Sequence, residues 1–491
     1  MPMMMIRRVM LWGASMLLSS GSVVMAQERA PEPLTLQQAI ERAQEQGNAA
    51  RAARSTRDAA RQRDRQFGST LLPQLSLTGT APEYNRSIIP VLQPDGTTEF
   101  RPQQQSQTDL SMMLSQRLPF TGGNLFISSS LARLQISGER ELRNWSATPF
   151  LVGLRQEIFR PNTLAWDSRE QDLRSDVAER QFLEAREDIA IQTTSAFFDY
   201  YAARMALANA ESNAAVNDTL YNLNKGRFEV GRIGENDLLQ SELALLRSRN
   251  AVDGARLDHD RTLAALRLLL GLAPGAALDI AVTNDIPLTT ADTALAVTQA
   301  LKNRAQVPEL ELQDVQARRR IREAQLNNGF GATVQASMGF NQTANDVGNV
   351  YSDLLQAQRF SVAVEMPLIQ WGGRKAAIAA ARADRGRVEA TSRQAREQTV
   401  QDAHFAALEL AQSARQLALS AKADTVATKR FEVAKNRYII GRIGIDNLYL
   451  AQNEKDQALL AYVQSLRGYW NTFYRLRRVT LWDFVAGEAI R

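Results

Sequence analysis

Residues 227–242 read RFEVGRIGENDLLQSE, and residues 437–452 read RYIIGRIGIDNLYLAQ. The two stretches lie 210 positions apart and share the motif GRIG, with a leucine four places after its second glycine. Each stretch stands between two long polar patterns that are rich in alanine and leucine and contain no proline, as antiparallel helices joined by a tight reversal would. The sequence therefore predicts a chain made of two copies of one unit, each with a helical hairpin.

The repeat also fixes the organisation of the chain. We predict a first copy at 27–283 with its hairpin end at 227–242, and a second copy at 284–491 with its hairpin end at 437–452. From Phe150 to Gln240 the two copies align without a gap, whereas their opening helices align at an offset of about 257. The first copy therefore holds an insert of about 47 residues, which includes residues 110–134. This insert is either an added β-hairpin or an elaborated loop.

Residues 1–26 have the pattern of a signal peptide. Arg7 and Arg8 precede the apolar run Val9–Leu18, and Val24-Met25-Ala26 fits a cleavage site with small residues. The apolar run is well short of the roughly 20 residues that a membrane helix needs. The chain contains no cysteine, so it can form no disulfide and carry no lipid on an N-terminal cysteine. We expect an exported protein that is held together by packing alone.

Outside the hairpins the hydrophobic period changes from helical to alternating. We predict helices at 35–65, 164–229, 235–271, 293–325 (with a break near Pro308), 374–438 and from the second hairpin end to 478. We predict strands at 75–79, 109–115, from 125 onward, 150–159, 332–340 and 360–369, short strands at 278–282 and 479–484, and a polar loop at 82–107. Weak alternation over about ten residues is typical of a transmembrane barrel. A soluble sandwich is the alternative for this part.

The predicted strands cannot close a barrel within one chain. Without the insert each copy of the repeat has two strands, and four strands would leave open edges, which lipid does not tolerate. A ring of subunits is therefore needed, and three chains would supply twelve strands, or more if the insert adds a hairpin. Helices of about 65 residues would extend roughly 100 Å and could close into a hollow cylinder. Such an assembly is a conduit.

The chain resembles the TolC family of outer-membrane efflux and export channels. The resemblance covers nearly the whole chain beyond residue 26 and includes both hairpin ends. It also rests on TLQQAIERAQ at 35–44, LLPQLSLTG at 71–79, QEIF at 156–159, MPLIQWGGR at 366–374 and YRLRRVTLWDF at 474–484. It implies a mainly α fold with a β-barrel part. Long antiparallel helices would form a trimeric α-barrel, joined to an outer-membrane β-barrel completed by strands from three chains.

The resemblance implies a function without catalysis. The chain would form a homotrimer in the outer membrane of a Gram-negative cell, with a large periplasmic part and outer-membrane lipid around its barrel. It would be a passive export duct for a tripartite efflux pump, docking a periplasmic adaptor (a membrane fusion protein) and an inner-membrane transporter. A duct for type I protein secretion is the alternative, and a periplasmic coiled-coil adaptor or structural protein is the rival of a different class.

Composition and motifs agree with a chain that is not an enzyme. The 58 Lys and Arg balance 53 Asp and Glu, and no basic block suits a nucleic acid. His259 and His404 are the only histidines and stand in helical patterns without ligand spacing. We therefore expect no cofactor, no metal site and no catalytic residues.

Acidic residues near the hairpin ends are the candidates for a periplasmic gate. In the family, acidic residues constrict the closed end of the tunnel, and Asp237 matches the acidic position in the first copy. In the second copy Asn447 stands at that position, with Asp446 one place earlier. We also expect side-chain oxygens of these residues to cap the helices that follow. The gate candidates are Asp237, Asp446, Asn447 and Glu235.

The GRIG motifs are the candidates for the turns and for docking of an adaptor. Their glycines would allow a tight reversal, their arginines would meet the adaptor and their isoleucines would supply contact area. The candidate residues are Gly231, Arg232, Ile233, Gly234, Gly441, Arg442, Ile443 and Gly444.

Overall fold

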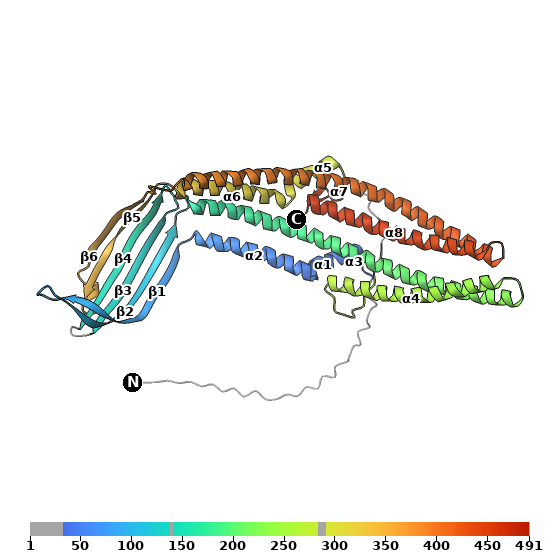
Figure 1. The fold of residues 1–491 in the computed structure, drawn as a ribbon, viewed down its shortest axis with the longest axis horizontal. Helices are drawn as coiled ribbons and strands as arrows, with labels where there is room; N and C mark the ends of the chain where they lie inside the picture. Colours follow the sequence, from blue (N-terminus) through green and yellow to red (C-terminus); the bar gives the residue numbers. More distant parts are fainter. Residues whose placement is uncertain (1–32, 138–140, 283–290, 491) are drawn as a thin grey trace, which may run out of the picture.

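The computed structural model describes residues 33–137, 141–282 and 291–490. The predicted signal peptide at 1–26 and the predicted boundary between the copies at 283/284 lie outside these residues. The molecule is elongated and mostly helical, with one large sheet at one end and two helical hairpins reaching to the other end (Figure 1). The mainly α fold with a β part is confirmed.

The helices and strands follow the repeat. The helices are α1 (Leu36–Gln46), α2 (Asn48–Thr70), α3 (Thr163–Glu229), α4 (Glu235–Leu269), α5 (Thr293–Asn303), α6 (Gln306–Asn327), α7 (Gly373–Ile439) and α8 (Ile445–Thr480). The strands are β1 (Gln74–Leu92), β2 (Thr98–Arg117), β3 (Asn124–Ser137), β4 (Leu142–Ile158), β5 (Gly331–Ala344), β6 (Leu355–Glu365), β7 (Trp482–Asp483) and β8 (Glu488–Ala489). A short 3₁₀ helix covers Asn349–Tyr351.

The two long helices give the molecule its length. Helices α3 and α7 each have 67 residues, which corresponds to roughly 100 Å. Helix α4 returns along α3 and α8 returns along α7, and α8 also packs against α3. The shorter helices α1 with α2, and α5 with α6, continue the lines of α4 and α8 toward the sheet (Figure 1). The predicted long helices and hairpins are therefore confirmed.

Two breaks divide the shorter helices. The first opening helix was predicted to be continuous, but it ends at Gly47, where an added Cβ would lie 2.5 Å from the Ala43 carbonyl oxygen and 2.8 Å from that of Leu269. The close approach of the α4 C-terminus therefore requires glycine and breaks the helix. The break expected near Pro308 lies between α5 and α6, and Pro308 stands in the first turn of α6, where the missing N–H costs no helical hydrogen bond.

One antiparallel sheet contains β1 to β6 in sequence order. The insert of the first copy forms most of β2 and β3, which lie between β1 and β4. This decides the alternative left open by the sequence, because the insert is an added β-hairpin rather than a loop. Each chain thus supplies six strands to one sheet rather than four.

The predicted polar loop at 82–107 is wrong. Strand β1 continues to Leu92 and β2 begins at Thr98, so the two strands extend past the rest of the sheet as a hairpin (Figure 1). Prolines misled the prediction, but β1 is an edge strand, where a proline need not donate to a neighbour. Pro82 lies at the irregularity between Thr80 and Glu83.

Three strand limits also differ from the prediction. Residues 278–282 form only one bridge, between Ile280 and Leu34. Helix α8 continues through Thr480, since Val479 is buried against other helices, and the terminal strand β7 is correspondingly shorter. Strand β6 ends at Glu365, two residues before Pro367, which has no N–H to donate to the sheet.

The largest hydrophobic core lies midway along the helices. It contains aromatic and leucine side chains from α3, α4, α7 and α8, together with small residues of α1 and α5. Phe197, Tyr469 and Leu410 are fully buried there. No helix in the described part of the chain has both the length and the apolar character needed to cross a bilayer.

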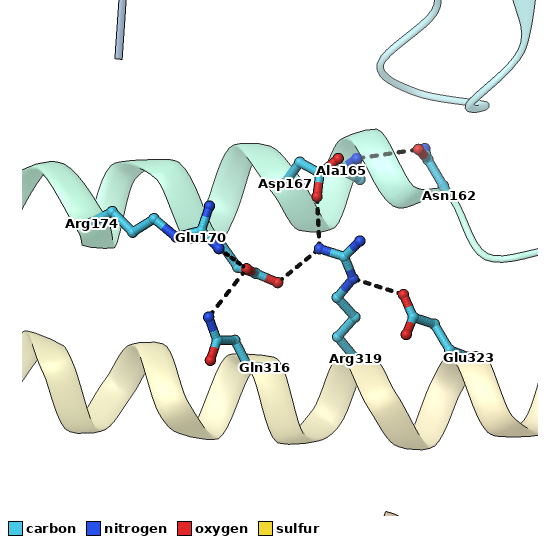
Figure 2. A network of polar contacts seen from close by, with 8 residues as sticks. All are labelled: Asn162, Ala165, Asp167, Glu170, Arg174, Gln316, Arg319 and Glu323. Carbon is cyan, nitrogen blue, oxygen red and sulfur yellow. Dashed lines mark hydrogen bonds and ion pairs between the residues drawn. The ribbon is translucent and has the colours of Figure 1, made fainter. Parts of the chain in front are cut away.

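An ion-pair network fastens α6 to α3 near the sheet (Figure 2). The Arg319 guanidinium lies 2.6 Å from Asp167 and 2.9 Å from Glu170, both on α3, and 2.8 Å from Glu323 on its own helix. Glu170 is buried and also accepts a hydrogen bond from Arg174 at 2.6 Å. Burial alone would lower the pKa of Arg319, but the hydrogen bonds to three carboxylates outweigh it and raise this pKa. Arg319 therefore stays charged and joins the two helices.

Replacing Arg319 tests this network. Breaking a fully buried pair costs about 3–5 kcal/mol. Because Arg319 is partly exposed, we expect Arg319→Ala to lower the free energy of unfolding by about 2–3 kcal/mol. The neighbouring Arg318 pairs only with Asp314 on its own helix and is more than half exposed, so Arg318→Ala should cost less than about 0.5 kcal/mol. Thermal unfolding in detergent measures both, and equal shifts would contradict a special role for Arg319.

Candidate functional site

The two hairpin ends, residues 227–242 (the first hairpin end) and 437–452 (the second hairpin end), have the same backbone. In the first, the Arg232 N–H donates to the Arg227 carbonyl at 2.8 Å and the Gly231 N–H donates to that of Phe228 at 2.9 Å. Gly231 has a φ of 67°, in the left-handed region that favours glycine. This is the Schellman arrangement that ends a helix.

The second hairpin end has the same Schellman arrangement. The Arg442 N–H donates to the Arg437 carbonyl at 2.9 Å, and Gly441 has a φ of 73°. Gly234 and Gly444 differ from these two, because they begin the next helices with φ of −79° and −75°, which any residue adopts. The turn therefore requires only Gly231 and Gly441, and the expectation that all four glycines enable it is wrong.

The expected side-chain caps are also absent from the hairpin ends. The residues before α4 and α8 are Gly234 and Gly444, which have no side chain to donate or accept. Glu235, Asp237 and Asp446 stand instead in the first helical turns, where negative charge is favourable near the positive end of the helix dipole. The interaction of their negative charge with the helix dipole, rather than side-chain capping, therefore explains why these acidic residues stand in the first turns of α4 and α8.

The four gate candidates differ in exposure and in partners. Asp446 is exposed and accepts a hydrogen bond of 2.7 Å from the Gln240 amide, so it reaches across to the first hairpin end. Glu235 and Asn447 are exposed, and Asp237 is half-buried. The structure thus brings Asp446 to the other hairpin of the same chain.

Further contacts between the two hairpins involve residues that sequence reasoning missed. The Tyr438 hydroxyl donates to Asn224 Oδ1 at 2.9 Å, and both side chains are buried. The Arg227 guanidinium lies over the Tyr438 ring, 5.5 Å from its centroid, and donates to the Ile439 carbonyl at 3.2 Å. These contacts join the hairpins of one chain close to their ends.

A signal for these residues exists in the repeat itself. At the matching positions Tyr438 corresponds to Phe228, Asn224 to Ala434 and Gln240 to Leu450. These three contact residues thus gain a hydrogen-bonding group that the other copy lacks, whereas Asp446 and Arg227 match polar residues, Asn236 and Arg437. A polar difference between otherwise similar copies therefore marks a position where the two hairpins meet.

The second hairpin end is the better packed of the two. A hydrophobic cluster gathers Leu220, Phe431, Tyr438, Ile445, Leu448 and Ala451. Ile443 packs partly against this cluster, whereas Ile233 does not belong to it. Arg232 and Arg442 are exposed. The two docking motifs, alike in sequence, therefore present different surfaces.

Further from the ends, a groove lined by both polar and apolar side chains lies between the hairpins. It has a volume of about 540 Å³ and is lined by residues of α3, α4 and α8, among them Asn217, Gln452 and Asp456. The Asp456 carboxylate accepts hydrogen bonds from Asn209 at 2.7 Å and Asn213 at 2.8 Å. Among the described residues, no group of three His, Cys, Asp or Glu is placed to hold a metal. The hairpins are thus joined in this region by polar contacts that water can replace.

Comparison with solved structures identifies the fold. Similar structures include the CmeC outer membrane channel of Campylobacter jejuni (TM-score 0.64, 15% identity, 93% of this chain and 87% of that chain). They also include the outer membrane protein VceC of Vibrio cholerae (TM-score 0.63, 14% identity, 93% of this chain and 97% of that chain). A third is the MtrE outer membrane channel of Neisseria gonorrhoeae (TM-score 0.60, 15% identity, 91% of this chain and 88% of that chain). No protein-family model and no curated protein sequence matches the chain. At these identities the likeness establishes the fold, which is the one expected from the resemblance to TolC-type channels.

The hydrogen bond between Tyr438 and Asn224 can be tested by removing the Tyr438 hydroxyl group. Tyr438→Phe leaves a buried Asn224 oxygen without its donor, so we expect a loss of about 1–3 kcal/mol and faster amide exchange at the second hairpin end. Tyr449 provides the control, because its hydroxyl is buried without a hydrogen-bond partner among the described residues and burial raises its pKa to about 12. Tyr449→Phe should leave exchange unchanged. Equal exchange in both variants would show that the bond does not hold the hairpins.

Proposed function

We propose that this chain is the subunit of an outer-membrane channel, and that three copies form a passive export duct from the periplasm to the outside. The observation that carries the proposal is a sheet with one apolar and one polar face, joined to helical hairpins of roughly 100 Å. An apolar outer face and a polar inner face are what a membrane barrel with an aqueous lumen requires.

The strand register sorts the side chains between the two faces. One face carries Leu75, Leu77, Leu110, Met112, Leu114, Leu125, Ile127, Leu131, Val152, Leu154, Ala336, Met338, Phe360 and Val362. The opposite face carries Ser76, Thr78, Asp109, Ser111, Ser115, Ser128, Ser130, Gln335, Ser337, Arg359 and Ser361. Large apolar side chains on the first face are mostly or half exposed, with Leu75 at 67% and Phe360 at 74%. Lipid is the environment that such a face fits.

Closure of the barrel needs further copies of the chain. Strands β1 and β6 are the two edges of the sheet, and in lipid their unpaired N–H and C=O groups would cost several kcal/mol each. Pairing β6 of one copy with β1 of the next satisfies these groups. A homotrimer closed in this way would place the hairpins of three chains around one tunnel.

The hairpin ends then form the periplasmic mouth of the duct. We propose that an efflux pump's periplasmic adaptor docks there against Arg232 and Arg442, and that an inner-membrane transporter supplies the cargo. The contacts of Tyr438 and Asp446 with the first hairpin favour a closed resting state that opens when the hairpins part. A duct for type I secretion would use the same chain with another transporter.

A periplasmic adaptor or structural coiled-coil protein is disfavoured, because neither role uses a large sheet with an exposed apolar face. Membrane fractionation separates these possibilities. A heat-sensitive trimer in the outer-membrane fraction supports the channel, and recovery of the whole protein with soluble periplasmic proteins would overturn it.

The turn glycines test the role of the hairpin ends. A β-branched residue strongly disfavours positive φ, so Gly231→Val and Gly441→Val should distort the turns at a cost of about 1–2 kcal/mol each. We expect the trimer to assemble while efflux, measured as resistance to exported drugs, is lost. Gly254→Val in helix α4, where an added side chain has open space, is the matched control and should keep resistance. Wild-type resistance in both turn variants would remove the hairpin ends from the mechanism.

The charge of Asp446 tests the gate. If Asp446 lines a ring at the mouth, Asp446→Ala should weaken the block of single-channel current by divalent cations in planar bilayers. Asp446→Asn can keep the hydrogen bond from Gln240 but removes the charge, so it should weaken the block equally. An unchanged block in both variants rejects Asp446 as a ring residue.

A further inference from the structure

We infer that the β2–β3 hairpin spans the membrane as part of the barrel wall, so that three copies enclose eighteen strands instead of twelve. This inference rests on the proposed function, since it takes the trimeric channel as given. It concerns the width of the outer-membrane passage and therefore the size of the cargo that can leave.

The pairing of the hairpin is continuous with the sheet. Strand β2 pairs with β1 from Gln74 to Leu92, interrupted only by the irregularity near Pro82, and with β3 over all of residues 124–137. Strand β3 pairs with β4 along nearly its whole length. A loop laid over the surface or a plug folded into the lumen would not supply two full ladders.

The apolar face also continues through the hairpin, interrupted by Ser129, which pairs with Met112. Leu110, Met112 and Leu114 of β2 lie on the same face as Leu77 of β1, because Leu77 pairs with Met112. On β3 that face carries Leu125, Ile127 and Leu131.

The opposite face of the hairpin is mostly polar, with Met113 and Phe126 as the exceptions. Ser111 and Ser115 of β2 lie there with Ser128 and Ser130 of β3. With water on both sides of the hairpin, its apolar side chains would be exposed unfavourably. Lipid on the apolar side and an aqueous lumen on the other side suit both sets of side chains.

Aromatic residues show that the hairpin extends as deep as the other strands. Its turn carries Phe120, which is 97% exposed. The register places this turn at the same end of the sheet as Phe159 after β4, Phe330 before β5 and Trp371 after β6. Such a row is the aromatic girdle at a membrane interface. Strand β3 has 14 residues, more than the roughly 9–11 that cross a bilayer.

Hydrogen bonds tie the hairpin to the junction between the sheet and the helices. The Asn162 amide at the start of α3 donates to the Pro119 carbonyl at 2.8 Å. The Gln156 amide of β4 donates to the Thr121 carbonyl at 3.0 Å, and that of Gln116 donates to the Leu71 carbonyl at 2.7 Å. The turn is thus held to the helices on both sides of the hairpin.

A wider barrel follows from the strand count. Barrel diameter grows roughly linearly with the number of strands, so eighteen strands give a diameter about 1.5 times that of twelve and a cross-section about twice as large. Barrels of about 16–18 strands leave an aqueous channel. The outer-membrane passage then suits solutes that are bulkier than a twelve-stranded wall would admit, and the periplasmic mouth sets the limit.

Single cysteines can test the wall, because the chain contains none. In the full-length protein in proteoliposomes, we expect Ser115→Cys and Ser128→Cys to react with a water-soluble maleimide. Leu114→Cys and Ile127→Cys should react at least about tenfold more slowly, because lipid excludes the reagent. Ser337→Cys and Met338→Cys on β5 are the matched control pair. Equal labelling on both faces of β2 and β3, with the β5 pair still distinct, would overturn the inference alone. Equal labelling in the β5 pair as well would overturn the proposed channel.

Deleting the hairpin tests the width. Removal of residues 98–137 joins β1 to β4 at the end of the sheet where both have their turns, and leaves four strands in each chain. In planar bilayers, polyethylene glycols of graded size are added on the extracellular side only, so that they probe the outer lumen. We expect the size cut-off to fall about 1.5-fold in the deletion variant. An unchanged cut-off in an assembled variant would overturn the inference, and if the variant does not assemble, the cysteine pairs decide.

Discussion

The structure depends on one constraint, which is that backbone N–H and C=O groups cannot be left unpaired in lipid. Among the described residues, the sheet edges β1 and β6 have no further strand partner, and the apolar face of the sheet is exposed. In the proposed channel, copies joined edge to edge would pair these edges and lipid would surround the apolar face. In the proposed channel this closure would bring the helical hairpins of the copies side by side, because each long helix continues from a strand through a short turn. The proposed tunnel would then be a consequence of pairing strands rather than a separate property of the helices.

Stability is distributed unevenly along the helices, and the distribution fits a gated duct. Aromatic and leucine side chains fill the core midway along the helices, and the carboxylates around Arg319 fix α6 to α3 beside the sheet. Beyond the central core, α3 and α8 face each other across a groove of mixed polar and apolar lining, and in the described part of the chain a small cluster and a few hydrogen bonds join the hairpins at their ends. Polar contacts exchange with water at little net cost, so this part of the molecule is the one that can open. In the proposed duct, the well-packed part would hold the barrel in place while the hairpin ends move.

Sequence reasoning succeeded where the signal is local. The long helices follow from their period and from the lack of proline. The hairpin reversals follow from Gly231 and Gly441, the two of the four GRIG glycines that have positive φ. It failed where the cause lies far away in the chain. Gly47 breaks a helix because the end of α4 approaches its backbone. Pro82 is tolerated because it lies at an irregularity of the β1–β2 pairing, and Pro90 because it lies where β1 and β2 extend past β3. The residues next to these positions in the sequence do not indicate either kind of tertiary contact. The capping prediction failed because glycine occupies the cap positions, so Asp237 and Asp446 are left to interact through charge.

The two copies of the repeat have diverged where they touch each other. Two identical surfaces can pair, as they do in a twofold-symmetric dimer, but the hairpins of this chain do not use that arrangement. Tyr438 lies opposite Asn224 and Asp446 opposite Gln240, while the matching positions are Phe228, Ala434, Asn236 and Leu450. Asn447, which stands where the first copy has Asp237, fits the same logic, because the neighbouring Asp446 already supplies the negative charge of the second end. The contacts between the two hairpin ends are therefore made by residues that differ between the copies.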